Sequence, residues 1–375
     1  MKIGCVNEVK DFEQRVGLMP SHAAEYIKAG HSVYVEAGLG LGSGFSDQMY
    51  LEAGAQVIEE AEEIWSQVDL MIKVKEPIPS EYNFLRPGLI LFTYLHLASN
   101  LELTQALLDK KVSAVAYETI TDDHGALPLL KPMSEVAGRL SIQEGSKYLE
   151  KTYGGKGILL SGVPGVTSGH VVILGGGAVG MSACKTALGT GATVSVLDRN
   201  IERLTYIEDV FQGQINTVYS DEDSLVKELI KADVVIGSVL LPGEKTPKLV
   251  RREHLKLMDP GTVLVDVAID QGGCFETSRP TTHSNPIFID EGMVHYCVTN
   301  MPGAVPKTST FALGIATLAI GLQIANKGIE LAVEENHHLL MGLNTHGGKI
   351  TNKAVSSALE LDFSEYEISV KPVQS

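Results

Sequence analysis

Cysteine is scarce in this sequence, with four in 375 residues. The four are Cys5, Cys184, Cys274 and Cys297. They form no C-x-x-C pair and show no metal-ligand spacing, which argues against a zinc-binding or disulfide-scaffold protein. His337 and His338 add no metal site, because adjacent residues on a helix point in different directions. We therefore expect reduced thiols, a cytoplasmic location and no bound metal.

Basic side chains are also few. The chain has 30 lysines and arginines against 46 aspartates and glutamates, which gives a formal net charge of -16. Such a surface repels the phosphate backbone of nucleic acids and anionic lipid headgroups. We expect neither nucleic acid nor a membrane as partner, although small anions can bind where cations or helix N-termini gather.

Long hydrophobic runs are missing. The first residues are charged at Lys2 and again at Glu8, so we expect no secretory signal. The most apolar stretch starts at Phe311 and runs for about a dozen residues before Gln323, whereas a bilayer span needs roughly 20. It follows "KTST", a run of good helix N-cap residues. The stretch therefore predicts a helix in the core or at a subunit interface.

The length and composition that are present fit two α/β domains, with 44% hydrophobic residues and 38 glycines. In the first third of the chain, apolar runs alternate with helical segments. The runs are "HSVYVEAG", "VDLMIKVKEP", "GLILFTYLHLA" and "VSAVAYETI". Continuous apolar strands between helices predict a parallel sheet that is covered on both faces.

A second series of strand-like segments follows, from "GHVVILGGGAVG" to "HYCVTNMPG". Its six segments are the number that a full dinucleotide-binding domain requires. Helices return from Thr310, and we expect them to pack on the first domain. The predicted fold is α/β, with two doubly wound domains. A Rossmann NAD-binding domain at 131–305 is inserted into a catalytic domain formed by 1–130 and 306–375.

The segment "VVILGGGAVG" places Gly175, Gly177 and Gly180 in G-x-G-x-x-G spacing between a strand and a helix. Glycines there allow the turn, the approach of a pyrophosphate and close helix–strand packing. The next strand ends in Asp198, whose carboxylate can accept hydrogen bonds from both ribose hydroxyls. The same carboxylate repels a 2′-phosphate, so the pattern predicts NAD rather than NADP.

Two arginines and a second glycine-rich segment leave alternatives open. Arg199 and Arg203 follow Asp198, and they are either surface or adenine-side residues or a clamp for a 2′-phosphate. Residues 37–47 are also rich in glycine, but Ser43 occupies the position of the final glycine. We interpret that segment as a flexible loop.

Three side chains of the first domain stand out as candidates for chemistry. Lys75 and His96 lie near the ends of two predicted parallel strands, the edge where α/β sheets bind ligands. His96 lies in the apolar run "LILFTYLHLA", where it is either a hydrogen-bonded core histidine or a proton-transfer group. Arg15 and Lys75 are either solvated surface charges or a pair of cations that binds a carboxylate.

The second domain contributes two aspartates in "VLVDVAIDQGG". Asp266 lies inside the predicted strand, and we interpret it as structural. Asp270 lies at the strand's end before two glycines, as in a loop that faces a ligand. It is therefore the candidate proton partner near the nicotinamide.

Several long segments of the sequence are similar to segments of the alanine dehydrogenase family, and they occur in the same order from end to end. They include "NEVKDFEQRVGLMP", "VKEP", "TYLHLA", "AYETI", "LPLLKPMSEVAGRLSIQEGSKYLE", "LLSGVPGV" and "NMPGAVPKTST". The resemblance implies NAD-dependent oxidative deamination of L-alanine to pyruvate and ammonium, and the reverse amination. It also implies an inserted nucleotide domain and a homohexamer.

The resemblance assigns roles to matching positions. Arg15 and Lys75 are implied to bind the substrate's carboxylate and carbonyl side, and His96 and Asp270 to be the acid–base pair. Besides the three glycines, the implied cofactor contacts are Ser134, Ala178, Val179, Asp198, Arg203, Ser220, Val239, Leu240, Val267, Ala268, Ile269, Asp270, Arg279, Val298, Thr299, Asn300 and Met301. The chain departs from the usual family words at Val6, Asp11 and Phe12, close to Arg15, which bears on the amino acid accepted.

Three alternative functions are considered, two from related enzyme families and one from non-enzymatic proteins. A transhydrogenase nucleotide-binding component lacks a small-substrate site, and an opine-type or saccharopine-type dehydrogenase needs a larger pocket. A non-enzymatic NAD sensor binds NADH without turnover. The joint presence of Arg15, Lys75, His96 and Asp270 argues against the sensor, which needs none of them.

Overall fold

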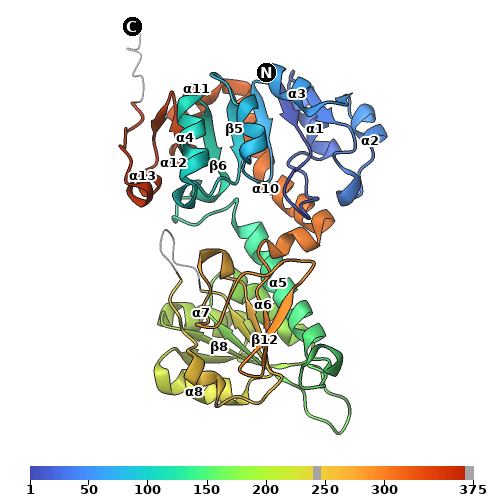
Figure 1. Ribbon diagram of the computed structural model, residues 1–375, viewed down its shortest axis with the longest axis vertical. Coiled ribbons are helices and arrows are strands. Elements are labelled where there is room, and N and C mark those ends of the chain that lie inside the picture. Colours follow the sequence, from blue (N-terminus) through green and yellow to red (C-terminus); the bar gives the residue numbers. More distant parts are fainter. Residues whose placement is uncertain (240–245, 368–375) are drawn as a thin grey trace. The chain divides into compact units, whose positions relative to one another are not determined.

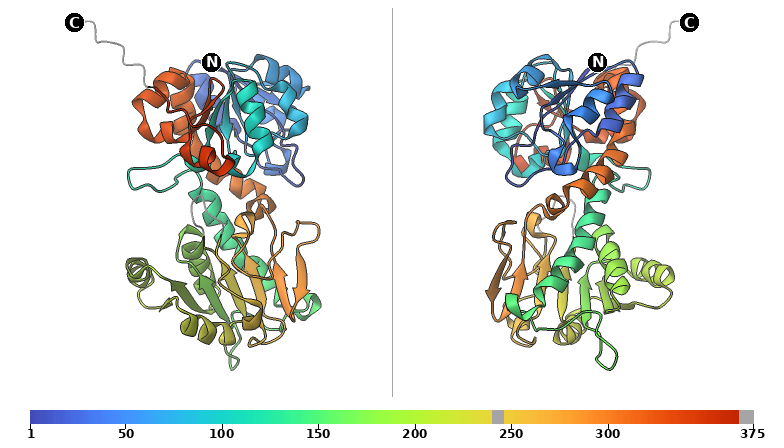
Figure 2. Two further views of the ribbon diagram at one scale, coloured as in Figure 1. Left: turned by 60° about the vertical axis from the view of Figure 1, so that its left-hand side comes forward. Right: turned by 90° about the vertical axis from the view of Figure 1, so that its right-hand side faces the viewer.

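The computed structural model describes residues 1–239 and 246–367. The chain divides into two units, each with its own sheet. Unit 1 comprises Met1–Pro132 and the chain from Val305 onward, and unit 2 comprises Met133–Ala304. Figures 1 and 2 show the two units, and each is described by itself below.

Among the described residues, unit 1 has an 8-stranded sheet in the order β15-β14-β6-β5-β4-β1-β2-β3. Its strands are β1 (Lys2–Cys5), β2 (Ser32–Glu36), β3 (Gln56–Ile58), β4 (Leu70–Ile72), β5 (Ile90–Thr93), β6 (Ser113–Ala116), β14 (Leu343–His346) and β15 (Lys349–Ile350). The six strands from β1 to β6 are parallel. The last two, from the C-terminal part of the chain, are antiparallel and extend the sheet beyond β6.

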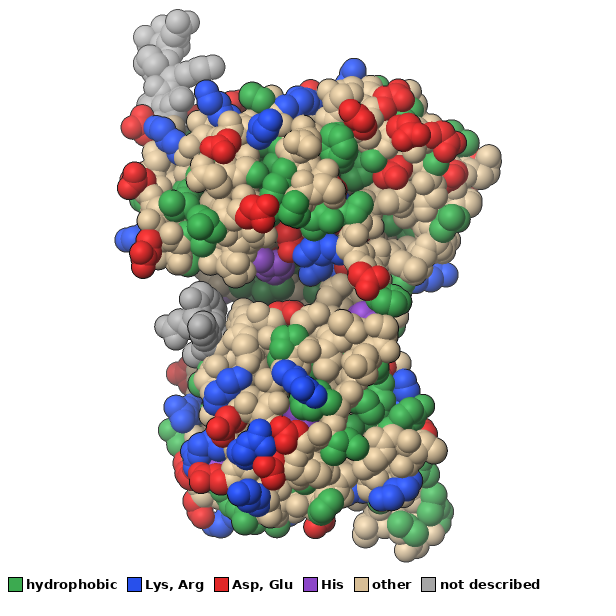
Figure 3. Space-filling model, in the orientation of Figure 1, with side chains coloured by type: hydrophobic (Ala, Val, Ile, Leu, Met, Phe, Trp, Pro, Cys, Tyr) green, Lys and Arg blue, Asp and Glu red, His purple; other side chains and the backbone are tan. Residues whose placement is uncertain are grey.

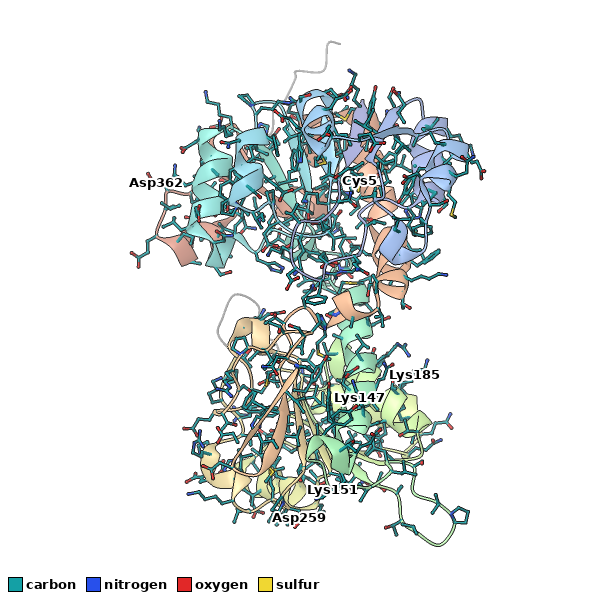
Figure 4. All side chains as sticks on the ribbon, turned by 45° about the vertical axis from the view of Figure 1, so that its right-hand side comes forward. Cys5, Lys147, Lys151, Lys185, Asp259 and Asp362 are labelled. Carbon is teal, nitrogen blue, oxygen red and sulfur yellow. The ribbon has the colours of Figure 1, made fainter. Side chains whose placement is uncertain are left out.

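Helices cover the unit 1 sheet on both faces (Figure 2). They are α1 (Pro20–Lys28), α2 (Asp47–Glu52), α3 (Ala61–Gln67), α4 (Leu101–Asp109), α10 (Pro306–Lys327), α11 (Ile329–Glu335), α12 (His337–Gly342) and α13 (Lys353–Leu359). One apolar core cluster joins Trp65 of α3, Leu91 of β5 and Leu107 of α4, all at most 1% exposed. Cys5 at the end of β1 lies inside this unit (Figure 4) and is fully buried.

Within its described part, unit 2 has a 7-stranded sheet in the order β12-β13-β11-β10-β7-β8-β9. Its strands are β7 (His170–Leu174), β8 (Thr193–Asp198), β9 (Asn216–Tyr219), β10 (Val234–Gly237), β11 (Val263–Asp266), β12 (Ile287–Asp290) and β13 (Met293–Tyr296). All pairs are parallel except the edge pair of β12 with β13. Without β12, this is the strand order of a dinucleotide-binding domain, with the switch point between β7 and β10.

The helices of unit 2 are α6 (Ala178–Gly189), α7 (Ile201–Phe211), α8 (Glu222–Lys231) and α9 (Arg252–Leu255). A further helix, α5 (Lys131–Tyr148), begins in unit 1 and continues into unit 2. α7 and α8 start where Asn200 and Asp221 accept backbone N–H bonds in the first turn, the usual N-cap arrangement.

The structure confirms an α/β fold with two parallel-dominant sheets. The expected strands of the first third correspond to β2, β4, β5 and β6, and those of the second series to β7–β11 and β13. The short strands β1, β3, β12, β14 and β15 were not expected. Residues 37–47 are a packed turn and not a flexible loop, because Ser43 is fully buried and bonds to Gln14 and Thr310.

The apolar helix α10 starts five residues earlier than its hydrophobic run. Among the described residues it is the one helix long and apolar enough to cross a membrane, by length and composition alone. It packs directly on α1, since a Cβ atom on Gly321 would lie 1.9 Å from the hydroxyl oxygen of Tyr26. Such close packing is typical of a helix in a protein core.

On the face that Figure 3 draws, charges of both signs are interspersed on unit 2, while acidic side chains predominate at the upper right of unit 1. In unit 2, for example, Arg251 lies 2.5 Å from Glu222, and Arg252 lies 3.0 Å from Asp290 and 2.7 Å from Glu291.

Candidate active site

The carboxyl ends of four neighbouring strands of unit 1 lie at one edge of its sheet, and candidate residues follow each end. β1 leads toward Arg15, β4 into Lys75 and β5 into His96. β6 leads into the short helix η4 (Tyr117–Thr119), which carries Glu118. Open α/β sheets bind ligands at this edge.

His96 is an exposed residue of a strained turn. Its side chain is 46% exposed, and its backbone is left-handed, with φ 51° and ψ 36°. Its ring stacks on that of Tyr94 at a centroid distance of 6.0 Å and an angle of 7°. The Tyr94 hydroxyl donates a hydrogen bond of 2.7 Å to the carbonyl of Leu129. The core-histidine interpretation is therefore wrong, and the imidazole is accessible to a ligand.

The carboxylate of Glu118 contacts the turn that carries His96. Oε1 of Glu118 accepts hydrogen bonds from the backbone N–H of His96 at 2.6 Å and of Leu95 at 3.1 Å. The same oxygen lies 4.0 Å from Nδ1 of the His96 ring. Because the Glu118 side chain is only 14% exposed, water does not compete strongly for these bonds.

Arg15 is a buried cation and not a solvated surface charge. It is 3% exposed, and its guanidinium donates to both oxygens of Glu13, from Nε at 2.7 Å and from a terminal nitrogen at 2.5 Å. Burial alone lowers the pKa of the guanidinium, but the Glu13 carboxylate outweighs burial and raises it. The side chain is therefore charged and held in one orientation.

Lys75 is partly exposed. Buried charged residues hold the segment that carries it. The backbone N–H groups of Val74 and Lys75 donate to Oε1 of Glu8 at 2.6 and 3.3 Å. The other oxygen of Glu8 lies 3.2 Å from Nζ of Lys73, which also bonds to Glu81 at 2.9 Å. Lys73 is fully buried, so this network fixes the segment that carries Lys75.

Unit 1 thus brings Arg15, Lys75 and His96 to one sheet edge. Arg15 also interacts electrostatically with Glu8, which holds the Lys75 segment. Two cations in such a setting can bind a carboxylate, and an exposed imidazole can exchange a proton.

In unit 2 the glycine-rich turn joins β7 to α6 as the sequence predicts. Gly175 has a φ of +98°, which favours glycine, and a Cβ atom on Gly180 would lie 1.9 Å from the Gly175 carbonyl oxygen. Gly177 caps α6, and a Cβ atom there would meet nothing within 4 Å. The turn therefore leaves open space beside the positive end of a 12-residue helix.

Asp198 and Arg203 both bond to the backbone of Gly176. Oδ2 of Asp198 accepts the Gly176 N–H at 2.7 Å, and Nε of Arg203 donates to the Gly176 carbonyl. The guanidinium carbon of Arg203 also lies 5.0 Å from the ring centroid of Tyr206. Arg203 therefore stabilises the glycine turn, while Arg199 is exposed.

The other cofactor candidates follow strand ends of the same sheet edge. Ser220 follows β9, Val239 follows β10, Val267, Ala268, Ile269 and Asp270 follow β11, and Val298, Thr299, Asn300 and Met301 follow β13. Leu240 lies outside the described residues. Ser220 donates its N–H to the Asp198 carbonyl at 3.0 Å, and a Cβ atom on Gly175 would lie 2.9 Å from the Val239 side chain.

Ser134 and the residues that open α6 come from two packed helices. A Cβ atom on Gly138 of α5 would lie 2.2 Å from the carbonyl oxygen of Val179, the second residue of α6 after Ala178. Ser134 lies one turn before Gly138 on the same helix face. α5 therefore brings Ser134 toward the glycine turn.

Asp266, which ends β11, and Asp270, which follows it, differ in burial. Asp266 is fully buried and accepts hydrogen bonds from the N–H of Cys274 at 2.8 Å and the Ser278 hydroxyl at 2.5 Å. It is a structural residue that fixes the following loop. Asp270 lies in the short helix η6 (Ile269–Gln271) of that loop and is exposed.

Arg279 lies farther along the chain than these residues, beside a cavity. The carbon of its guanidinium is 4.2 Å from the ring centroid of Phe288. Both residues line a cavity of about 360 Å³ together with residues 280–282, Asn285 and Ile287. The contact with Phe288 and the cavity do not test a cofactor role for Arg279, which stays a prediction.

The sequence reasoning missed the residues that hold the candidates in place. They are Glu8, Glu13, Lys73, Tyr94 and Glu118. Each lies in or beside a segment that resembles the alanine dehydrogenase family, and this resemblance could have pointed to them. Their contacts, however, depend on the pairing of strands that are distant in the sequence. In residues 1–239 and 246–367, no group of three or more histidine, cysteine or acidic side chains is placed to hold a metal ion.

Known proteins match the chain along nearly all of its length. The family model described as alanine dehydrogenase/PNT, N-terminal domain, matches residues 4–137, and the model for the C-terminal domain matches residues 141–353. An alanine dehydrogenase of Methanococcus maripaludis is 52% identical over 368 residues, 98% of this chain and 99% of the relative. An alanine dehydrogenase 2 of Staphylococcus aureus is 51% identical over the same shares.

Solved structures agree. An L-alanine dehydrogenase has a TM-score of 0.93 and 47% identity, covering 96% of this chain and 99% of that one. A transhydrogenase from Sinorhizobium meliloti has a TM-score of 0.81 and 23% identity, covering 94% and 100%, and it supports the fold alone. The chain therefore belongs to the alanine dehydrogenase/PNT family.

Proposed function

We propose that this protein catalyses the oxidative deamination of L-alanine to pyruvate and ammonium with NAD, and the reverse reductive amination. The balanced reaction consumes L-alanine, NAD⁺ and water and gives pyruvate, ammonium, NADH and a proton. The observation that carries the proposal is the meeting of Arg15, Lys75 and His96 at one edge of unit 1, in a chain about half identical to alanine dehydrogenases throughout its length.

The residues of unit 2 fit a nicotinamide dinucleotide. The space beside Gly177 and the N-terminus of α6 suit a pyrophosphate, and the carboxylate of Asp198 at the end of β8 suits ribose hydroxyls. Asp198 favours NAD over NADP, because a carboxylate repels a 2′-phosphate. The remaining candidates at this edge would complete the binding surface. When bound, NAD would supply the hydride acceptor.

Arg15 and Lys75 bind the carboxylate and carbonyl side of the substrate in this proposal. Glu13 keeps the Arg15 guanidinium charged and oriented, and Glu8 fixes the backbone that carries Lys75. Because the Arg15 side chain is held by the protein before the substrate arrives, little of its side-chain entropy is lost on binding.

His96 is the proposed acid–base group. In deamination it removes a proton from the water that attacks the imine carbon, and it shuttles protons as the carbinolamine releases ammonium. Asp270 of unit 2 is the proposed second member of the acid–base pair. Both residues belong to turns at the carboxyl ends of parallel strands.

The experiment that tests this function is NAD reduction by L-alanine, with pyruvate and ammonium measured as products. Equal amounts of NADH, pyruvate and ammonium are expected, with far slower turnover of glutamate or of NADP. NADH binding without any amino-acid-dependent turnover would contradict the proposal and would indicate a nucleotide-binding component.

We also propose a cytoplasmic homo-oligomer, a hexamer by family resemblance. Apolar side chains of α10 support an association surface, since Phe311 is 42% and Ile315 is 73% exposed in the single chain. Light scattering of the purified protein is expected to give the mass of several chains. The mass of one chain at micromolar concentration would contradict it.

A further inference from the structure

The left-handed turn at His96 depends on one acidic side chain. β5 ends at Thr93, and the backbone then leaves the sheet. Glu118 accepts the N–H of Leu95 and of His96, so its carboxylate takes the place of a strand partner for two successive residues. An L-residue at φ 51° is strained, and such strain persists only where the surroundings impose it.

The same carboxylate lies beside one nitrogen of the imidazole. Glu118 Oε1 is 4.0 Å from Nδ1, while the face of the ring lies against Tyr94. A negative charge at this distance favours a proton on Nδ1, which leaves Nε2 as the nitrogen that accepts or donates the proton in the reaction. Tyr94 lies against the face of the ring, and Glu118 holds the His96 backbone.

We propose that Glu118 is a positioning residue of the reaction, which acts only through His96. Its carboxylate holds the His96 backbone in the left-handed conformation and directs Nδ1, so that Nε2 is presented to the substrate. The inference rests on the proposed acid–base role of His96 and adds a second residue to it.

Two substitutions separate the parts of this role. Glu118→Gln keeps an oxygen that can accept the two backbone N–H groups but removes the charge, and Glu118→Ala removes both the oxygen and the charge. Glu102→Gln is the matched control, because Glu102 is an exposed glutamate on the nearby helix α4. His96→Asn provides the second background, since asparagine tolerates the left-handed conformation better than most residues.

The measurement is steady-state reductive amination of pyruvate, with NADH affinity measured separately by fluorescence. We expect kcat to fall about tenfold in Glu118→Gln and about a hundredfold in Glu118→Ala, because a small displacement of a catalytic group is costly. The pyruvate KM and the NADH Kd are expected to change less than about threefold, since Glu118 acts in this proposal through His96 and not on either ligand. In the His96→Asn background, Glu118→Ala is expected to cost nothing further.

Three results would overturn the inference. A kcat of Glu118→Ala equal to that of the Glu102→Gln control would show that the carboxylate is dispensable. An equal loss with and without His96 would show that it acts by another route. Full turnover by His96→Asn alone would instead refute the proposed role of His96 itself. Circular dichroism checks folding, and Glu118→Gln carries the test if the alanine variant does not fold.

Discussion

At the scale of single residues, a glutamate contacts the side chain or backbone of each candidate substrate-binding residue of unit 1. Glu13 holds the Arg15 guanidinium, and Glu118 holds the His96 turn. Glu8 holds the Lys75 backbone and is itself paired with Lys73. None of these carboxylates has to contact the substrate, so their contribution is to fix the groups that do, before binding occurs.

The acid–base role of His96 makes the first prediction. His96→Asn is expected to lower kcat for reductive amination by roughly 10²–10⁴-fold, the usual range for removal of a general acid–base catalyst. The NADH Kd is expected to stay within about twofold, because His96 belongs to unit 1 and the glycine turn to unit 2. Turnover within a factor of a few of the unmodified protein would rule out this role.

The buried Lys73 makes a prediction about stability. Lys73→Met leaves the carboxylates of Glu8 and Glu81 buried without their cation, which is expected to cost about 3–5 kcal/mol. Urea unfolding followed by fluorescence of Trp65, the single tryptophan, reports on the core of this unit. Combining Lys73→Met with Glu8→Gln and Glu81→Gln is expected to restore part of the loss. An unchanged midpoint for Lys73→Met would refute the account.

At the scale of elements, parallel strands bring the candidate residues together. β1, β4, β5 and β6 end at the same edge of unit 1, and β7–β11 with β13 end at one edge of unit 2. The chemistry-bearing residues lie in the turns after these strands, where the backbone is irregular. Positive φ values at His96, Asn300 and Gly175 occur in three of these turns.

The glycine turn of unit 2 makes a prediction with an internal control. Gly177→Ala has room in the protein, since its Cβ atom would meet nothing within 4 Å, so the fold is expected to tolerate it. NADH affinity is nevertheless expected to fall at least about tenfold, because a pyrophosphate would approach that backbone closely. Gly189→Ala, in the last turn of the same helix α6, also meets nothing and is expected to leave affinity unchanged. Equal NADH affinity in both variants would contradict this account of the turn.

Much of this arrangement could be predicted from the sequence because it depends on local patterns. Continuous apolar runs indicated the buried strands, and the spacing of Gly175, Gly177 and Gly180 indicated the dinucleotide turn. The strands β3, β12 and β15 lie at sheet edges and are partly exposed, so they lack the continuous apolar run that indicated the other strands. The contacts of Glu118 with His96 were not predictable, since they require β5 and β6 to pair in one register.

At the scale of the whole molecule, burial makes all four cysteine thiols unreactive. Burial raises the pKa of Cys5, Cys184, Cys274 and Cys297 to about 12. A buried thiol of such high pKa carries little thiolate and is inert. The scattered cysteines of the sequence are therefore structural residues in both units.

The thiols make a prediction with a defined dependence on pH. The native protein is expected to react negligibly with a disulfide reagent at about pH 8, and the unfolded protein to release four equivalents. Between about pH 9 and 12 the folded chain keeps thiol protons that the unfolded chain loses, so the free energy of unfolding falls as the pH rises. Rapid titration of one or more thiols in the native protein would contradict this burial.

The measurement that tests the central claim most directly is NADH oxidation on addition of pyruvate and ammonium together. Parallel reactions contain 2-oxoglutarate with ammonium, pyruvate without ammonium, and NADPH in place of NADH. The account predicts fast turnover only with pyruvate, ammonium and NADH combined, and its loss in His96→Asn. Tight NADH binding without turnover on any acceptor would contradict it.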